Sequence, residues 1–423
     1  MLLYFPFIFF FTLTFYYWKK KGYIDVAVFL FAEYALTSFA AILCVKMDLL
    51  GAGGILFTQE TLQLNIVPTL LYCILISLII QQFAKLDIKR YNTISISNQK
   101  IFHLFTYFLF AIALLNIYVV IDNVISVIIG GNFAEVRAAH YEGETNMSQL
   151  ESLPKILGYL YYFNRSTLLA LPCFFYSICF LQKHWTYHLA LLITALSVPL
   201  SGIQNADRTE FIFFAQTLIL SLLLFRPYIH KKQKIFLKRL LIPLGIFFML
   251  YLAAVTIARF GERDAGASGG ALQYAGQSYL NFCYYYEFAN NEHIYTNRMF
   301  PLLNHIISDT SYLNDIKDKQ CDQQGFFVGV FPSFLGDFLL DTGIIGMLVW
   351  VFGFLFITNI SFRFTKGDTI SFGNALWYYV LATIPMFGIF YYPYFEFMQG
   401  IFLVLTVVVS ILFHFRLKSH SSL

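Results

Sequence analysis

The sequence predicts an all-α protein that crosses a membrane many times. Hydrophobic residues make up 58% of its 423 residues and charged residues only 12%, and the mean hydropathy is +0.66. Apolar runs of about 18 or more residues recur along the chain, and a helix of that length crosses the hydrocarbon core of a bilayer. We expect helices because lipid offers no partner for backbone polar groups. The composition excludes an ordinary soluble globular protein.

Eleven apolar segments have the length expected of a membrane span. The first lacks a basic leader and a small-residue cleavage site, so we expect a retained helix and not a signal peptide. We expect residues 1–423 to form a single transmembrane domain. The expected spans are roughly 2–18, 24–45, 63–83, 101–121, 155–181, 188–205, 208–225, 240–257, 343–360, 372–391 and 397–414.

The distribution of lysine and arginine predicts the orientation of these spans, because cytoplasmic loops are enriched in both residues. One alternating set of connections holds most of the 28 basic residues and few acids. We expect this set to be cytoplasmic, with the N-terminus outside and the C-terminus inside. Its basic residues are Lys19, Lys20, Lys21, Lys85, Lys89, Arg90, Lys100, Lys183, Arg226, Lys231, Lys232, Lys234, Lys238, Arg239, Arg363, Lys366, Arg416 and Lys418.

The opposite connections are acidic or neutral, and the longest of them is 258–342. This segment has ten acidic and five basic residues, and it is the only long stretch without a span. We therefore expect one large outer loop at 258–342. A membrane protein that holds one such loop in place is expected to carry out its chemistry there, so the few arginines of the acidic outer face are candidate site residues.

Arg208 is the first of these candidates, because it begins a span after the short turn SGIQNADRTE. A cation at a helix N-terminus is unfavourable with respect to the helix dipole, so a negative group is expected beside it. In a structural interpretation that group is Asp207 or Glu210, which have the spacing of a capping box. In a functional interpretation it is a phosphate of the substrate.

Arg259 and Arg263 form a second candidate cluster at the end of the eighth span. Their spacing of four residues places both on one face of a helix, where two guanidinium groups could grip a pyrophosphate. The alternative pairs them with Glu262 and Asp264 at a solvated helix end. Arg165 lies in or at the outer end of the fifth span and either faces the bundle interior or a wet cavity, or extends to the interface.

Acid–base chemistry has fewer candidates. Asp337 and Asp341 are four residues apart where a helix re-enters the membrane, and a carboxylate there could accept a proton from a sugar hydroxyl. His305 is a further candidate. The alternative is that the two carboxylates only favour a helix N-terminus.

The aromatic residues of the loop offer a surface for sugars. Tyr274, Tyr279 and Tyr285 could stack on sugar rings, and an interfacial aromatic belt is the alternative interpretation. Cys283 and Cys321 both fall in the loop, and the sequence leaves open whether they pair. No cysteine or histidine spacing typical of a metal site occurs.

Several activities lack their sequence motifs. The chain has no Walker A loop, Rossmann fingerprint, HExxH or GxSxG. A soluble nucleotide-binding domain is also missing, so we expect no nucleotide cofactor and no nucleic-acid partner.

The pattern resembles the bacterial polymerases of lipid-linked oligosaccharide repeat units, the O-antigen and capsule polymerases of the Wzy type. Three features carry the resemblance: about eleven spans with a dominant outer loop, an arginine that opens a span after a Gly-containing turn, and the segment PSFLGDFLLDTGIIG (332–346). Arg208 resembles the first family arginine, and Arg259 and Arg263 resemble those that begin the large loop. Arg259 and Gly270 also match an Arg-x10-Gly spacing described for some members.

The resemblance implies a fold similar to that of O-antigen ligases and related GT-C-like glycosyltransferases. It implies metal-independent transfer of a glycan from undecaprenyl pyrophosphate, at the periplasmic face of a bacterial inner membrane, without a cofactor. Asp337 occupies the neighbourhood in which the ligases carry a histidine, which favours a polymerase over a ligase. The implied partners are undecaprenyl-pyrophosphate-linked glycans, membrane lipid, and a chain-length regulator and flippase of the same pathway.

Two alternatives to a polymerase remain open. The first is an O-antigen ligase, which would transfer the glycan to a lipid A–core acceptor. The second belongs to another class, a flippase or transporter of lipid-linked oligosaccharides. A flippase is expected to place charge in a central cavity within the spans, whereas this sequence concentrates charge in the loop 258–342.

Overall fold

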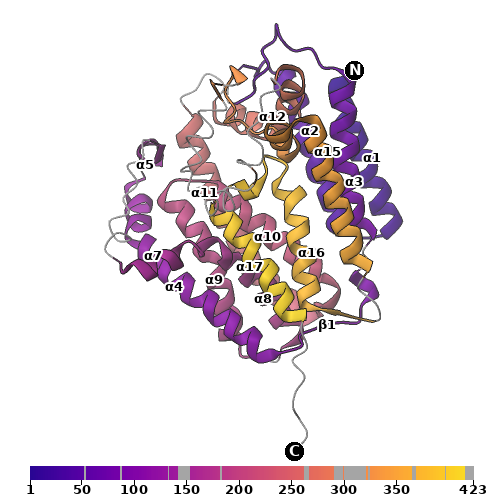
Figure 1. Cartoon of the computed structure of the whole chain (residues 1–423). Coiled ribbons are helices and arrows are strands. Elements are labelled where there is room, and N and C mark those ends of the chain that lie inside the picture. The colour runs from indigo at the N-terminus through magenta and orange to yellow at the C-terminus, as the bar shows by residue number, and fades with distance from the viewer. Residues whose placement is uncertain are drawn as a thin grey trace, which may run out of the picture. The chain divides into compact units, whose positions relative to one another are not determined.

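The protein is helical in the computed structural model, with one very small sheet. The structure describes residues 1–423 except 52–53, 86–87, 132, 142–152, 182, 262–265, 290–298, 300–320, 323, 364–367, 396 and 415–423. In these described residues the chain forms 14 α-helices (Figure 1). Seven helices are long and apolar enough to cross a membrane. The prediction of a polytopic helical membrane protein is therefore confirmed.

The expected count of eleven spans is not confirmed within the described ranges. The helices α1 (Phe5–Lys21), α16 (Phe372–Phe387) and α17 (Phe397–His414) coincide with expected spans but are short. The seven candidate spans are Val26–Lys46, Ile66–Arg90, Gln99–Gly130, Trp185–Gln204, Thr209–Tyr228, Lys231–Ala258 and Ser333–Ser361.

The chain divides into two compact units. Unit 1 comprises Met1–Asp87, Arg263–Phe364 and Leu381–Gly400, and unit 2 comprises Ile88–Glu262, Thr365–Val380 and Ile401–Leu423.

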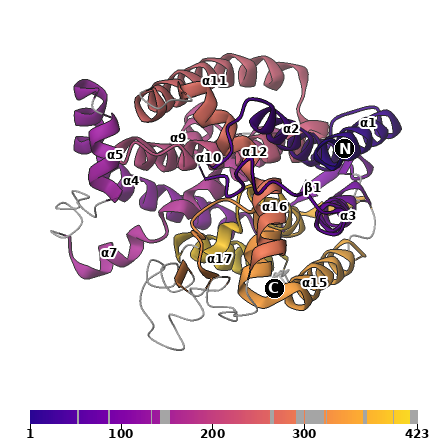
Figure 2. The same ribbon diagram turned by 90° about the horizontal axis from the view of Figure 1, so that it is seen from above.

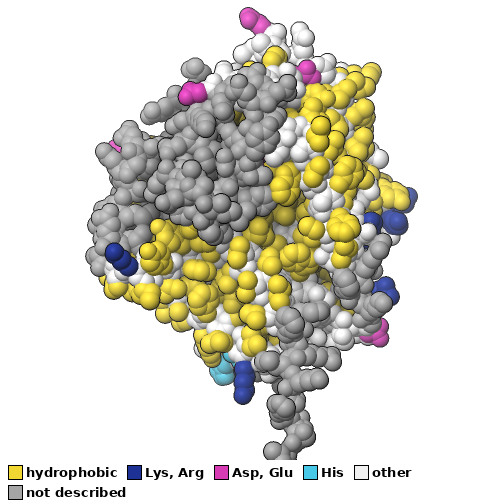
Figure 3. Space-filling model, viewed as in Figure 1, with side chains coloured by type: hydrophobic (Ala, Val, Ile, Leu, Met, Phe, Trp, Pro, Cys, Tyr) yellow, Lys and Arg dark blue, Asp and Glu magenta, His cyan; other side chains and the backbone are white. Residues whose placement is uncertain are grey.

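Hydrophobic side chains cover most of the described surface on the face shown in Figure 3. Such a surface is suited to lipid contact, because monomeric soluble proteins rarely expose large contiguous apolar areas.

Unit 1 is organised around α12 (Gly266–Phe288), which packs on α2 (Val26–Lys46), α3 (Ile66–Lys85) and α15 (Ser333–Arg363). Figures 1 and 2 both show α12 beside α2. The two helices cross closely at Gly276, where a Cβ atom would lie 2.7 Å from the backbone nitrogen of Ala41. Only glycine allows this approach of two backbones.

The expectation of a large outer loop at 258–342 is not confirmed, because α12 lies within this segment and is largely buried. Its polar side chains bind the chain that follows α2. Gln273 donates to the carbonyl oxygen of Leu49 (3.0 Å), and Asn281 donates to that of Gly54 (2.8 Å). The backbone amide of Leu56 donates in turn to the side-chain oxygen of Asn281 (3.0 Å).

Helix α15 begins ten residues before the span expected at 343–360 and is interrupted at Gly343. Gly343 has non-helical dihedral angles (φ 70°, ψ −177°), so a first helical segment ends there and a second continues to Arg363. The start of the first segment is held by the backbone: the amide of Ser333 donates to the carbonyl of Phe390 (2.8 Å), and that of Phe334 to the carbonyl of Gly388 (2.9 Å). The second segment therefore begins where the span 343–360 was expected to begin, and the first segment is an additional helix before it.

Unit 2 contains the long helix α4 (Gln99–Gly130), which packs on α9 (Trp185–Gln204). The helices α8 (Ala170–Phe180) and α10 (Thr209–Phe225) also pack on α9. The expected fifth span, 155–181, is broken: a 3₁₀ helix, η3, lies between two short helices. The polar run Asn-Arg-Ser-Thr (164–167) forms this break. The α-helices of unit 2 outside α16 and α17 are α4 (Gln99–Gly130), α5 (Phe133–Tyr141), α7 (Lys155–Tyr161), α8 (Ala170–Phe180), α9 (Trp185–Gln204), α10 (Thr209–Phe225) and α11 (Lys231–Phe260), and η3 spans Asn164–Leu169.

The sheet joins two identical tripeptides of unit 2. β1 (Thr93–Ser95) pairs in parallel with β2 (Thr369–Ser371), with Ile94 opposite Ile370. Each strand leads directly towards a helix, α4 or α16. Further 3₁₀ helices are η1 (Leu2–Tyr4), η2 (Ile88–Arg90), η4 (Arg226–Tyr228) and η5 (Pro393–Phe395).

Candidate functional site

The turn between α9 and α10 positions Arg208. The backbone amide of Asp207 donates to the carbonyl of Gly202 (2.7 Å), and the Asp207 carboxylate accepts from the amide (3.1 Å) and the hydroxyl (3.0 Å) of Thr209. Asp207 thus satisfies the first amide of α10, as the sequence predicted. The predicted capping-box partner, Glu210, forms a different interaction.

Glu210 forms a buried ion pair with Arg165. The Arg165 Nε donates to Glu210 Oε1 (3.0 Å), and Nη2 of the same guanidinium also contacts this oxygen. The two residues are 8% and 9% exposed, and the guanidinium lies over the Phe213 ring at 5.4 Å. A buried charge requires such a partner, because an isolated one would lose its hydration.

Asp207 pairs with a second arginine, Arg137 of α5. Nη2 of Arg137 lies 3.7 Å from Oδ1 of Asp207. Burial raises the pKa of Asp207, but Arg137, the hydrogen bonds from Thr209 and the charge of Arg165 together outweigh it, so the pKa lies below its ordinary value. Asp207 is therefore ionised at neutral pH.

Arg208 reaches towards α11. Its Nη1 donates to the hydroxyl of Thr256 (3.3 Å), and its Cζ lies 5.0 Å from the centre of the Phe260 ring. Arg208 as a whole is half-buried. Arg137 thus pairs with Asp207 and Arg165 with Glu210, and Arg208 lies between these two acids in the same turn, with its guanidinium on α11. We call these five charged residues, three basic and two acidic, the arginine cluster.

A buried polar network holds the part of η3 that carries Arg165. Asn116 of α4 donates to the carbonyl of Ser197 (2.6 Å) and to the hydroxyl of Ser201 (3.0 Å). Asn164 donates to the same Ser201 hydroxyl (3.0 Å), and the hydroxyls of Thr167 and Ser197 are 3.0 Å apart. Because the network joins α4, α9 and η3, it orients the arginine beside the turn.

An apolar groove adjoins the same turn. It has a volume of about 300 Å³ and is formed by α9, α10 and α11. Ile203 and Phe211, on either side of Arg208 in the sequence, both line it. The Phe211 ring stacks on Tyr251 with centroids 4.1 Å apart, and the Tyr251 hydroxyl donates to the carbonyl of Gly202 (3.3 Å). The groove residues are Ile193, Leu196, Pro199, Leu200, Ile203, Phe211, Leu244, Phe247 and Phe248.

Asp337 and Asp341, the predicted acid–base candidates, are deeply buried in unit 1. Oδ2 of Asp337 accepts the backbone amide of Tyr392 (2.6 Å), and Oδ2 of Asp341 accepts that of Met299 (3.2 Å). Their exposed fractions are 1% and 0%. Both carboxylates thus connect the first segment of α15 to other parts of the chain, a role that neither sequence interpretation included.

The predicted sugar-stacking tyrosines differ in exposure. Tyr279 and Tyr285 are 2% and 0% exposed. The Tyr279 hydroxyl lies 2.9 Å from that of Thr69, and the Tyr285 hydroxyl donates to the carbonyl of Val328 (3.3 Å). Tyr274 is partly exposed and meets the Phe331 ring edge-on at 5.5 Å. Of the three rings, only Tyr274 has a surface open to a ligand in this structure.

The remaining candidates are only partly described. Arg259 lies in the last turn of α11, but its side chain, and the whole of Arg263 and His305, lie outside the described residues. All six cysteines are free, so Cys283 and Cys321 do not pair. Among the described residues, no group of three or more histidine, cysteine or acidic side chains could hold a metal ion.

Arg208 and Arg165 both lie in unit 2, and Asp337 and Asp341 both lie in unit 1. Arg137 and Glu210 belong to the arginine cluster but were not among the predicted site residues. Glu210 carried a usable signal: an acid in the first turn of an apolar span needs a cationic partner. The sequence around Arg137 gave no signal of its role, because its partner Asp207 is 70 residues away.

Comparison with protein-family models, curated proteins and solved structures gave no match.

Proposed function

We propose that this protein is a membrane glycosyltransferase that polymerises oligosaccharide repeat units linked to undecaprenyl pyrophosphate. The observation that supports it best is the position of the arginine cluster beside an apolar groove, both at the start of α10. A lipid-linked glycan combines an anionic pyrophosphate with a long hydrocarbon chain. The guanidinium of Arg208 suits the pyrophosphate, and the groove that begins at Ile203 and Phe211 suits the chain.

The reaction follows from the chemistry of such a donor. The bond between the anomeric carbon and the pyrophosphate oxygen breaks, and its electron pair leaves with the pyrophosphate. An acceptor hydroxyl of the incoming repeat unit bonds to the anomeric carbon and releases its proton. Arginine side chains stabilise the negative charge that develops on the leaving group, which is the kind of interaction that contributes most to many enzymatic rates.

The other predicted residues take supporting roles in this proposal. Arg259 and Arg263 would bind pyrophosphate, and Asp337 would position or deprotonate the acceptor hydroxyl, with Asp341 and His305 as the other candidates. Tyr274 is the tyrosine best placed to meet a sugar ring. The reaction would take place at the periplasmic face of a bacterial inner membrane, and without a metal ion because pyrophosphate is already a good leaving group.

The decisive experiment uses the purified full-length protein in detergent and a synthetic repeat unit on undecaprenyl pyrophosphate. The products are separated on a gel, with and without a metal chelator. A ladder of increasing length that persists with the chelator supports the proposal. Transfer of a single glycan to lipid A–core, with no ladder, would support a ligase instead.

A flippase of lipid-linked oligosaccharides is the second candidate, and one observation favours it. A flippase is expected to carry charge and polar groups within its spans, and unit 2 buries the Arg165–Glu210 pair next to the network of Asn116, Asn164 and Ser201. In proteoliposomes, movement of the repeat unit between leaflets without chain growth would establish this function and contradict the polymerase.

A further inference from the structure

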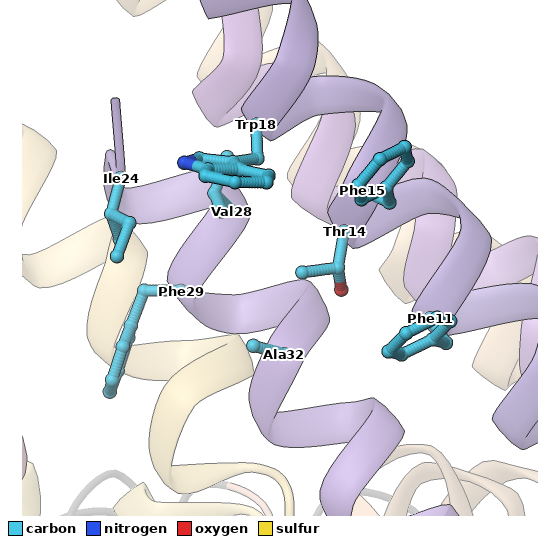
Figure 4. Close-up of a pocket in the computed structure, with 8 residues that line it drawn as sticks. All are labelled: Phe11, Thr14, Phe15, Trp18, Ile24, Val28, Phe29 and Ala32. Carbon is cyan, nitrogen blue, oxygen red and sulfur yellow. The ribbon is translucent and has the colours of Figure 1, made fainter. Parts of the chain in front are cut away.

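A second apolar groove lies in unit 1, between α1 and α2. Its volume is about 330 Å³, and Figure 4 shows the side chains that line it: Phe11, Thr14, Phe15, Trp18, Ile24, Val28, Phe29 and Ala32. Trp18 and Ile24 lie at one end, near the turn that joins the helices, and Phe11 and Ala32 lie further along. Seven residues separate Trp18 from Phe11, so the groove extends for about 10 Å along α1.

The lining of the groove suits a hydrocarbon chain. Its one hydroxyl, that of Thr14, donates to the carbonyl of Phe10 (2.8 Å) and is thus already satisfied. The rim is open: Phe11 is 56%, Trp18 47% and Ile24 46% exposed. Small-ligand pockets measure about 300–1,000 Å³, so this volume accommodates a segment of one lipid chain and not a bulky polar ligand.

The end of α1 that follows Trp18 is positively charged. Lys19 and Lys20 directly follow Trp18 and are exposed, whereas Lys21 is paired with Asp25. Lys20 lies 5.8 Å from the Tyr16 ring. Within the described residues, Lys19 and Lys20 form no ion pair with a carboxylate. Both charges also interact favourably with the helix dipole at the C-terminus of α1. That interaction would be the same without a groove.

We propose that the α1–α2 hairpin binds an anionic phospholipid, with an acyl chain in the groove and the phosphate on Lys19 and Lys20. Clusters of basic residues at the end of a membrane helix attract anionic lipids, because each lysine interacts favourably with the negative surface. The groove adds a second interaction that a surface lysine cluster lacks. This site lies in unit 1 and involves no residue of the arginine cluster, so it is independent of the proposed enzymatic activity.

The test titrates the full-length protein in detergent with phosphatidylglycerol or phosphatidylcholine of the same acyl chains. Native mass spectrometry measures the bound lipid. Lys19→Gln with Lys20→Gln removes the charge, Ala32→Phe fills the groove, and Lys231→Gln with Lys232→Gln is a matched control at an exposed helix end. We expect wild-type protein to prefer phosphatidylglycerol and each lysine to contribute about fivefold to its affinity. Ala32→Phe should weaken binding of both lipids.

Three outcomes would overturn the proposal: equal affinity of wild-type protein for the two lipids, an unchanged preference in the Lys19/Lys20 variant, or the same loss of preference in the Lys231/Lys232 control. The Lys19/Lys20 variant changes only exposed side chains, so it tests the proposal even where Ala32→Phe does not fold. An intact Ala32→Phe protein that keeps its affinity would place the bound lipid outside the groove.

Discussion

Arg165 and Glu210 form a buried ion pair that joins the 3₁₀ helix η3 to the first turn of α10. Forty-five residues separate them in the sequence. The pair places Arg165 close enough to Asp207 for its charge to act on that carboxylate. The Arg208 guanidinium contacts Thr256 and Phe260 of α11 instead. Glu210 thus holds Arg165 in the arginine cluster.

Arg165→Met is expected to destabilise the protein strongly, because it leaves the Glu210 carboxylate buried without its guanidinium. Removal of one partner from a buried pair costs about 3–5 kcal/mol. The double variant Arg165→Met with Glu210→Gln should lose less than the sum of the two single variants. Unfolding by denaturant in detergent micelles measures these differences, with Arg90→Met as an exposed control. Strictly additive losses would mean that the pair is not coupled.

Stability should depend on the ionisation of Asp207. Its folded pKa lies below the unfolded value, so the ionised carboxylate stabilises the fold above the ordinary carboxyl pKa of about 3.9, and this contribution disappears as the pH falls through the folded pKa. We expect the stability difference between wild type and Asp207→Asn to be constant between about pH 6 and 8 and to shrink below about pH 4. Thermal unfolding at several pH values checks this. A difference that stays constant down to pH 3 contradicts it.

Arg208→Ala should reduce polymer formation on the order of 100-fold, the effect of removing one donor that stabilises developing charge. Arg208→Lys should recover only part of the activity, since lysine lacks the planar fork of the guanidinium. Arg226→Ala, just beyond the other end of α10, is the matched control. Ladder formation by protein of equal purity and stability is the readout. Full-length ladders from Arg208→Ala would exclude Arg208 from the site.

Asp337 allows its structural and catalytic roles to be separated. Asp337→Asn keeps an oxygen that can accept the Tyr392 amide, whereas Asp337→Ala removes it. If Asp337 takes the acceptor proton, Asp337→Asn should fold normally but form no polymer. If its role is only to hold Tyr392, Asp337→Asn should stay active while Asp337→Ala loses about 1–3 kcal/mol of stability. Unfolding and ladder assays on both variants distinguish these outcomes.

Gly276→Ala tests the close crossing of α12 and α2. The added Cβ would meet backbone atoms of Ala40 and Ala41 at 2.7 to 2.9 Å, and overpacking of this kind costs about 1–3 kcal/mol. Gly245→Ala in α11 is the control, because no atom lies within 4 Å of its added Cβ. We expect a lower melting temperature in detergent for Gly276→Ala alone. Equal melting temperatures of the two variants would show that the helices can separate at little cost.

The sequence by itself determined that this is a helical membrane protein, since apolar runs of span length have few other stable conformations. It also determined that Asp207 would satisfy the start of α10, because capping depends on neighbours one or two residues away. These properties are local, and local properties can be read from spacing.

The tertiary structure alone decided the partners of the charged and aromatic residues. Arg165 was expected to face the bundle interior, a wet cavity or the interface; it lies in the interior, and the fold alone supplies its partner, Glu210 of another helix. Tyr279 and Tyr285 were candidates for sugar stacking, but packing in unit 1 buries them. The segment around α12 had the composition of an outer loop, yet its polar side chains are buried through hydrogen bonds to distant backbone groups. The physical reason is that the free energy of burying a polar group depends on the partner it finds, and that partner is brought by the fold and not by the neighbouring sequence.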